Sequence, residues 1–250
     1  MKDIIFEKEY SVNSINININ KHLGLFGMLG ILQDVSTIHA ELLGLGFEYM
    51  AKSNSFWVLT QQRLKMDHWP TWQDVVNVRT WPRGANGLKA NRDFEIFLND
   101  KKIGECVTTY MVIDGNTRKP VRADLGDEIQ KACPSDVLDF EPEKVLVPET
   151  ATLKKTIEVR NSDLDMNNHV NNTKYSQWIL DTIPLEFHRS MKLLDFDINF
   201  ISEARLGELI DIYSISDDTS NAPYLESFYK GIRKSDGKIV FAARIRAIPK

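Results

Sequence analysis

Two stretches of the chain repeat apolar residues at the helical spacing, and each runs into a helix-stopping residue. The first predicts a helix from Leu25 to Leu43 that ends at Gly44-Leu45-Gly46. Its apolar face carries Met28, Leu32, Val35, His39 and Leu42. The second predicts a helix from Asn172 to Ile183 that Pro184 ends, with Asn171 or Asn172 as its cap. Its apolar positions are Tyr175, Trp178, Ile179 and Thr182. Both helices are too apolar for an isolated surface position, so we expect each to be wrapped by its own sheet.

Segments that alternate apolar and polar residues follow each helix and predict antiparallel strands. In the first half they cover residues 57–66, 72–78, 94–98 and 105–113, and in the second half residues 193–201, 206–212, 225–233 and 238–248. Polar hairpin tips separate the last two strands of each half, at Asn99–Lys102 and at Lys234–Gly237. Each half therefore has the same order, one helix and then a run of antiparallel strands.

The region between the halves has no sustained periodicity. After a short helical candidate at 124–131, Pro134, Pro142 and Pro148 punctuate it. We therefore expect an N-terminal domain over 1–133, a linker over 134–150 that crosses the surface, and a C-terminal domain over 151–250.

The groups best able to move protons and bind oxyanions are concentrated between residues 163 and 175. Asp165, Asn167 and His169 occupy alternate positions, so on an extended segment their side chains would leave from one face. The segment leads into the N-terminus of the second helix, where free N–H groups and the helix dipole favour an oxyanion. Asn and Asp before a helix are most often turn and cap residues. Three such groups at alternating positions exceed what capping requires, and we predict that they converge on a substrate.

The first half offers a looser counterpart of this segment at residues 15–21. The alternation is kept there, but in this alignment neither the carboxylate nor the imidazole is retained. The same alignment places Trp69 where the second half has Glu203, after the first central strand. We expect one active site per chain, built from the second half. The alternative for Glu203 is a solvated acid paired with Arg205.

Composition narrows the function classes. With 250 residues and 42% hydrophobic content the chain can bury a large core, and its net charge of −4 argues against a nucleic-acid binder. No run approaches the ~20 apolar residues of a membrane span, and the first residues lack the features of a secretion signal, so we expect a cytoplasmic protein. The two cysteines, Cys106 and Cys133, have no metal-ligand spacing. No phosphate-binding loop appears, and neither a metal nor a cofactor is expected.

Several segments together resemble the acyl-ACP thioesterases of plants and bacteria. In the second half the matching run is Asp165-x-Asn167-x-His169-Val170-Asn171-Asn172-x-Lys174-Tyr175, followed by Trp178-Ile179-Leu180. In the first half the matches are Trp57-Val58-Leu59-Thr60, Trp69-Pro70-Thr71-Trp72-x-Asp74-Val75-Val76, Thr80-Trp81 and Gly84-x-Asn86-Gly87. The resemblance extends roughly from Ile31 to Arg205. It implies an α+β fold of tandem hotdog domains, each a long helix wrapped by a curved antiparallel sheet, paired as a pseudo-dimer.

The resemblance also implies hydrolysis of fatty acyl-ACP thioesters to free fatty acid and carrier protein, with Asp165, Asn167, His169 and Glu203 as the catalytic residues. The family has been read as using a cysteine nucleophile after the acid, but here Ala204 follows Glu203. We therefore favour direct attack by water with Glu203 as base. Whether Glu203 or His169 is the general base stays open, as do the preferred acyl chain length and a homodimer.

The resemblance places the acyl pocket in the first hotdog, and its partner, the acyl carrier protein, is acidic. Candidate lining residues of the pocket are Met28, Leu32, Val35 and Trp57. Candidate docking residues for the carrier are Arg83, Lys89, Arg92, Arg118, Lys119 and Arg122.

Three alternatives remain. The first is hydrolysis of acyl-CoA on the same fold. The second is dehydration of hydroxyacyl substrates, but hotdog dehydratases carry their histidine in a His-Phe-Pro-type turn, which does not occur in this sequence. The third is a non-catalytic module that binds an acyl group.

Overall fold

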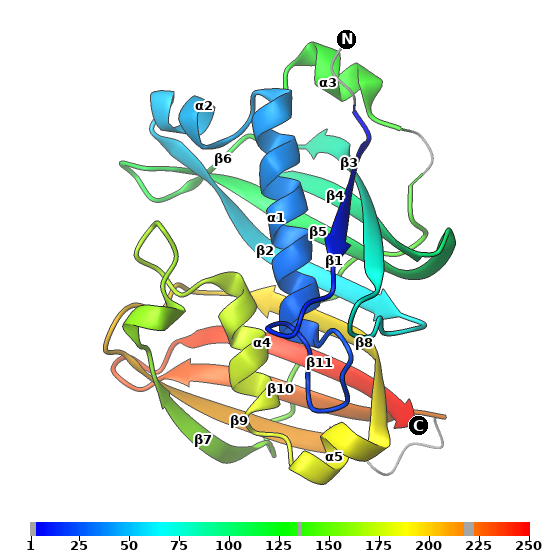
Figure 1. Cartoon of the computed structure of the whole chain (residues 1–250). Helices are drawn as coiled ribbons and strands as arrows, with labels where there is room; N and C mark the ends of the chain where they lie inside the picture. Colours follow the sequence, from blue (N-terminus) through cyan, green and yellow to red (C-terminus); the bar gives the residue numbers. More distant parts are fainter. Residues whose placement is uncertain (1–3, 135–136, 218–222) are drawn as a thin grey trace. The chain divides into compact units, whose positions relative to one another are not determined.

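The computed structural model describes residues 4–134, 137–217 and 223–250, which fall into two compact units. The first unit comprises the chain up to residue 17 and residues 22–142, and the second comprises residues 143–250 together with the short segment 18–21. Each unit has a helix lying across its own antiparallel sheet (Figure 1). This confirms the predicted α+β arrangement.

The sheet of the first unit has the strand order β1-β3-β4-β5-β2, and every neighbouring pair is antiparallel. Its strands are β1 (Phe6–Ser11), β2 (Ser55–Met66), β3 (Val75–Asn86), β4 (Lys89–Leu98) and β5 (Lys101–Asp114), with the short β6 (Pro120–Val121) paired to β5. Its helices are α1 (Leu25–Leu43), α2 (Phe47–Lys52) and α3 (Asp127–Ala132). The predicted hairpin tip is a two-residue turn in which Asn99 and Asp100 have positive φ.

Helix α1 has the predicted bounds. It ends because Gly44 adopts a left-handed conformation, with φ 76°, and its N–H bonds back to the carbonyls of Ala40 and Glu41. The predicted apolar face is buried at four positions, Met28, Leu32, Val35 and His39.

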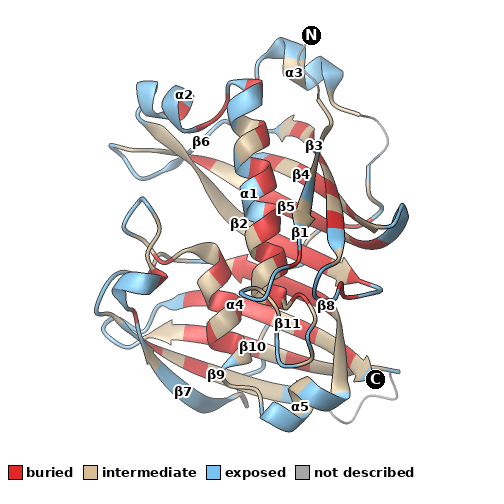
Figure 2. Ribbon diagram, viewed as in Figure 1, coloured by how far each residue is buried: buried red, intermediate tan, exposed pale blue. Residues whose placement is uncertain are grey.

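The prediction for Leu42 is wrong, because this side chain is 58% exposed. The last turn of α1 buries Leu43 instead, which packs with Leu45 and Leu125 beyond the glycine. The chain that returns after Gly44 therefore decides which residue of the last turn is covered. Figure 2 shows the buried stripe of α1 on the side facing the sheet.

The sheet of the second unit has the order β8-β11-β10-β9-β7, again entirely antiparallel. Its elements are β7 (Thr152–Glu158), α4 (Asn172–Leu180), α5 (Leu185–Ser190), β8 (Met191–Phe200), β9 (Leu209–Asp217), β10 (Leu225–Arg233) and β11 (Ile239–Pro249). Helix α4 starts where predicted but ends before Asp181, so the prediction of a helix to Ile183 is too long. Pro184 precedes α5 and begins this second helix.

The residues between α3 and β7 that the structure describes form no helix or strand, yet strand side chains hold their main chain. Arg83, which pairs with the buried Asp93 at 2.5 Å, donates to the carbonyl of Leu138 at 2.9 Å. In the second unit Asn199 donates to the carbonyl of Glu143 at 2.8 Å. Backbone groups that a loop would leave open to water are thereby satisfied. The predicted limits of the linker and domains stay a prediction.

Candidate active site

The segment from Asp163 to Asn171 is a closed turn, and the prediction of an extended segment is wrong. Leu164 and Val170 form an isolated bridge, and the N–H of Asp165 donates to the carbonyl of His169 at 2.8 Å. The reason is the Asp165 carboxylate, which accepts from the N–H of Asn167 at 2.8 Å and of His169 at 3.3 Å. An aspartate whose carboxylate accepts hydrogen bonds from the N–H groups of the residues that follow it favours a turn over a strand.

The three side chains have different surroundings in this turn. The Asp165 carboxylate serves the main chain of its own turn, and the Asn167 side chain is exposed. The His169 side chain is partly buried, with 23% of its surface exposed. The catalytic roles of Asp165 and Asn167, and the convergence of the three groups on a substrate, stay predictions.

His169 and Glu203 are brought together. The imidazole Nε2 lies 3.2 Å from Glu203 Oε2, and the Glu203 side chain is 36% exposed. Arg205 also reaches the same carboxylate oxygen, at 3.5 Å, but its side chain is 63% exposed. The pairing with Arg205 and the pairing with His169 therefore coexist, and a water molecule could reach both the imidazole and the carboxylate.

The turn that carries Glu203 is fixed through its main chain. Val170, next to His169, donates its N–H to the carbonyl of Ala204 at 3.0 Å. Arg233, at the end of β10, donates from Nη1 to the carbonyl of Glu203 at 2.8 Å. Sequence reasoning missed Arg233, because nothing in a strand-end arginine indicates which distant carbonyl it will contact.

The N-terminus of α4 is capped by Asn171, one of the two predicted residues. Its side-chain oxygen accepts from the N–H of Thr173 at 2.9 Å, and its carbonyl accepts from the N–H of Lys174 at 2.9 Å. These two donors of the first turn are already bonded. Fewer N–H groups therefore remain at this helix end to bind an oxyanion than the sequence predicted.

Tyr175, predicted only as part of the apolar face of α4, also belongs to this neighbourhood. It is 4% exposed, and its ring packs against Trp178, Phe200 and Phe241. Burial raises the pKa of Tyr175, the Ala204 N–H opposes that rise, and the carboxylates of Glu203 and Asp165 add to it. The phenol is therefore neutral.

The first half contains the same turn before α1. Ile17 and Leu23 form the matching bridge, and the N–H of Asn20 donates to Asn18 Oδ1 at 2.9 Å. Lys21 has φ 62° where Asn168 has φ 60°. In this register His22 corresponds to His169.

The prediction that the first half lacks the imidazole is therefore wrong. The alignment over residues 15–21 stopped one residue short of His22, because the alternating Ile and Asn residues gave no fixed register.

The turn after the first central strand is also repeated. Leu23 donates its N–H to the carbonyl of Pro70 at 2.7 Å, as Val170 does to Ala204. Trp69 therefore stands at the position of Glu203, which confirms the alignment made from the sequence. His22 Nδ1 lies 3.0 Å from the carbonyl oxygen of Trp69, so this ring nitrogen faces the main chain.

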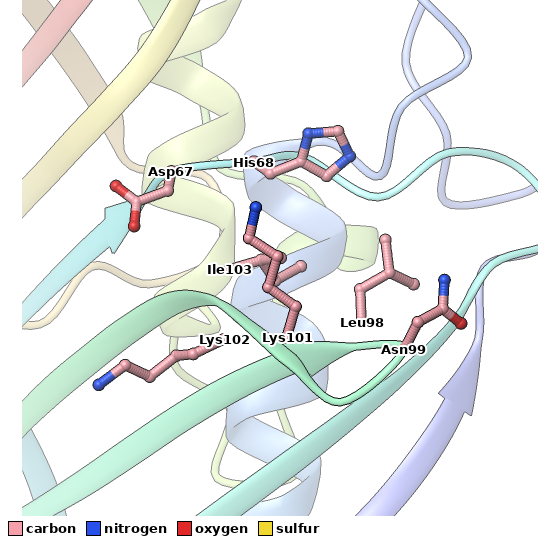
Figure 3. Close-up of a pocket in the computed structure, with 7 residues that line it drawn as sticks. All are labelled: Asp67, His68, Leu98, Asn99, Lys101, Lys102 and Ile103. Atoms are coloured by element: carbon pink, nitrogen blue, oxygen red, sulfur yellow. The ribbon is translucent and has the colours of Figure 1, made fainter.

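A pocket of about 540 Å³ in the first unit does not fit an acyl chain. It lies between the end of β2 and the β4–β5 hairpin, and Lys101 extends toward His68 (Figure 3). Its lining is mostly polar: Asp67, His68, Leu98, Asn99, Lys101, Lys102 and Ile103. The predicted acyl-lining residues and the predicted catalytic residues are elsewhere.

Two of the predicted docking residues are wrong. Arg92 is 8% exposed and bonds to His39 and Thr80, with its pKa lowered by burial. Arg83 is held by Asp93 and by the carbonyls of the linker. The other four, Lys89, Arg118, Lys119 and Arg122, are exposed.

Over the described ranges, no group of His, Cys, Asp and Glu side chains is arranged to hold a metal ion. Within the same ranges, no helix combines the length and apolar character needed to cross a membrane.

Sequence models of a known protein family match both halves of the chain. The sequence model of the acyl-ACP thioesterase N-terminal domain matches residues 3–132, and that of the C-terminal domain matches residues 147–246. The chain belongs to the acyl-ACP thioesterase family. This confirms the resemblance seen in the motifs around His169 and Trp69.

Two relatives of this acyl-ACP thioesterase family member are plant proteins. A chloroplastic palmitoyl-acyl carrier protein thioesterase of Gossypium hirsutum is 30% identical over 99% of the chain and 64% of its own length. A chloroplastic acyl-[acyl-carrier-protein] hydrolase of Cuphea viscosissima is 26% identical over 99% of the chain and 63% of its length. The chain thus spans less than two thirds of these relatives.

Two solved structures show the fold. An acyl-ACP thioesterase from Bacteroides thetaiotaomicron superposes with a TM-score of 0.88 at 23% identity, covering 98% of both chains. The 12:0-ACP thioesterase from Umbellularia californica gives 0.87 at 21% identity, covering 100% of this chain and 96% of its own. The fold is therefore the tandem hotdog expected from the sequence.

Proposed function

We propose that this member of the acyl-ACP thioesterase family hydrolyses fatty acyl-ACP thioesters to free fatty acid and carrier protein. The observation that supports the proposal most directly is the contact of 3.2 Å between His169 Nε2 and Glu203 Oε2. A partly exposed imidazole beside a carboxylate is a pair that can take a proton from water. The proposed substrate would be met in the cytoplasm, the location expected from the sequence.

In the proposed reaction, a water oxygen attacks the thioester carbonyl carbon while Glu203, or His169 supported by Glu203, takes the water proton. The tetrahedral intermediate then breaks its C–S bond, and the proton passes to the leaving thiolate. The acid product and the free thiol account for all atoms of water and thioester. A positioned base contributes ~10²–10⁴-fold to such a step.

Asp165 and Asn167 have different proposed parts in this reaction. Asp165 shapes the turn through the N–H groups of Asn167 and His169, and so sets the direction in which the imidazole leaves. The exposed Asn167 carboxamide is the proposed donor to the developing oxyanion. One such donor is worth ~10²–10³-fold in rate.

The acyl chain is proposed to lie in the first unit, between α1 and its sheet. Met28, Leu32 and Val35 are almost fully buried on that face of α1. Trp57 packs against Leu43 and Leu45 at the C-terminal end of α1, with its indole N–H donating to the carbonyl of Leu45 at 3.0 Å. These side chains supply the dry, apolar lining that a fatty chain requires.

The test is release of free thiol from purified protein given acyl-ACPs of graded chain length, with the matching acyl-CoAs measured in parallel. Turnover of acyl-ACP at a higher kcat/KM than acyl-CoA is expected. Preference for acyl-CoA would favour the hydrolase of that substrate. Saturable binding of acyl-ACP without thiol release would favour the non-catalytic module.

A further inference from the structure

We infer that the pocket at the end of β2, in the first unit, binds a small organic phosphate. Lys101 and His68 hold the phosphate group, and the apolar part of the ligand lies against Leu98 and Ile103. The volume of about 540 Å³ is within the range of small-molecule sites. The inference goes beyond the proposed hydrolysis, because none of these side chains belongs to the pair of His169 and its carboxylate.

The second unit has the same backbone arrangement at the corresponding place. In the first unit the carbonyl of Ile103 accepts the N–H of His68 at 3.2 Å. In the second unit the carbonyl of Val240 accepts the N–H of Ser202 at 3.1 Å. The two carbonyls fix the register in which the β4–β5 and β10–β11 hairpins can be compared.

In this register Leu98 stands where the second unit has Arg233. Lys101 and Lys238 lie equally far before the two accepting carbonyls. Leu98 is the strand partner of Lys101, and Arg233 donates its N–H to the carbonyl of Lys238 at 2.9 Å. The two hairpins therefore differ by a leucine and an arginine at one position.

This difference explains why the first unit has a pocket. In the second unit the Arg233 side chain fills the corner and is only 13% exposed. Its guanidinium donates to the carbonyl of Glu203 at 2.8 Å. It also pairs with Asp236 at 2.9 Å and with Glu208 at 3.4 Å. A leucine is shorter and makes none of these bonds, so the same corner of the first unit stays open where Leu98 lines it.

The pocket contains a cation and an imidazole that the rest of the unit does not use. The Lys101 amine extends toward His68 (Figure 3). Within the described ranges, neither the amine nor the ring has a hydrogen-bond or ion-pair partner. Lys102 points away from them and pairs with Glu95 and Glu105. Lys101 and His68 are therefore the donors available to a ligand.

The position of the one carboxylate in the lining decides where an anion fits. The Asp67 carboxylate lies on the side of the Lys101 amine that is away from His68 (Figure 3). An anion between the amine and the imidazole is thus attracted by both and stays clear of the carboxylate.

The donors fit a phosphate group better than a carboxylate. An ammonium is a point charge with three donors, and an imidazole offers an N–H in either tautomer. A phosphate group brings about −1.5 to −2 charge and three acceptor oxygens to them. Bidentate binding of a carboxylate is typical of arginine, and the described lining contains none. The buried Ile103 and the half-buried Leu98 supply an apolar surface beside these donors.

The test titrates the full chain with phenyl phosphate, inorganic phosphate and benzoate, using isothermal titration calorimetry. Phenyl phosphate should bind most tightly, because its ring covers Leu98 while its phosphate meets Lys101. Inorganic phosphate lacks the apolar part, and benzoate carries a single charge. No binding of phenyl phosphate, or binding of either other probe at least as tight, would overturn the inference.

A pair of variants tests the cation. Lys101→Met removes the charge and keeps the length of the side chain, and it should weaken binding of phenyl phosphate by about tenfold. Lys238→Met is the matched control, because Lys238 has the same place in the other hairpin and pairs with Asp236 at 3.5 Å. It should leave the Kd within about twofold. Equal changes in the two variants would show that the overall charge, and not the pocket, attracts the anion.

A third variant tests the pocket itself. Leu98→Trp fills the space without changing any charge, so it should abolish binding of phenyl phosphate while Tm stays close to that of the wild type. Binding that persists in the folded variant would place the ligand elsewhere and refute the inference.

Proton NMR of the histidine rings tests the site in the wild type, whether or not Leu98→Trp folds. Phenyl phosphate should shift the ring signals of His68 and leave those of His169 in place. Ring signals of His68 that do not move at saturating phenyl phosphate would refute the assigned site.

Discussion

The turn before α1 and the turn before α4 have the same backbone arrangement, but the histidine of each turn has a different partner. Both close with a bridge, bend at a residue with positive φ, and end in a histidine. His22 faces the carbonyl of Trp69 at 3.0 Å, whereas His169 faces the carboxylate of Glu203 at 3.2 Å. A backbone arrangement that both turns share thus does not specify function.

The partner of each histidine decides what its ring can do. A main-chain carbonyl only accepts hydrogen bonds, so His22 carries a proton on Nδ1 where this nitrogen meets Trp69. A carboxylate can accept a proton from water as well as hold an imidazole. The replacement of Trp69 by Glu203 at equivalent positions is therefore the difference that we expect to separate a structural histidine from a catalytic one.

The largest effect is expected from removing each histidine in turn. His169→Ala should lower kcat by ~10²–10⁴-fold with Tm nearly unchanged, because the side chain serves the reaction. His22→Ala should leave kcat within a few-fold. Steady-state kinetics and thermal melts of both variants decide the matter. Similar losses in the two would mean that the comparison between the copies does not reflect function.

A somewhat smaller effect is expected from Glu203→Gln, which keeps size and hydrogen bonding but cannot accept a proton. It should lower kcat by about 10²-fold while KM changes little, if Glu203 is the base. A fully active variant would assign water activation to His169 with Asp165.

Asp165→Asn makes the second turn resemble the first, where Asn18 accepts the same N–H at 2.9 Å. The turn should therefore form normally, with an unchanged Tm. We expect kcat to fall by about tenfold, less than for His169→Ala, because the carboxylate positions the backbone and does not touch the imidazole. A fall as large as that of His169→Ala, in a folded protein, would give Asp165 a direct part in proton transfer.

The smallest effect is expected from replacing the two cysteines, because neither belongs to the two turns compared above. Cys106 is buried in the core and Cys133 is partly buried near the end of α3. The double variant Cys106→Ser, Cys133→Ser should keep kcat within a few-fold. A folded double variant as inactive as His169→Ala would restore a covalent cysteine mechanism.

The helices could be predicted from their local sequence. Other elements could not, because tertiary contacts define them. Helix α1 has its predicted bounds because its apolar period and the stop at Gly44 agree. Strand β1, with the sequence Phe6–Ser11, alternates between half-buried and exposed residues and carries three charges, so only its pairing with β3 defines it. Pro184 predicts the end of a helix, yet in the structure it is the N-cap residue of α5.

The catalytic residues stay predictions, and the sequence argument that led to them is partly wrong. The alternation of Asp165, Asn167 and His169 suggested an extended face, but the Asp165 side chain bends the segment. The contact of His169 with Glu203 came from the resemblance, since no local pattern links these positions. The bond from Arg233 to the carbonyl of Glu203 could not be predicted, because a strand-end arginine gives no sign of which distant carbonyl it will contact.

Pro70 shows which part of the two turns is free to vary. Leu23 bonds to the carbonyl of Pro70 and Val170 to the carbonyl of Ala204, and every residue, proline included, has a carbonyl. These two bonds therefore place no demand on the side chain or the N–H of the accepting residue. A duplicated chain can change the residues at these positions, as between Trp69-Pro70 and Glu203-Ala204, and keep the turn closed.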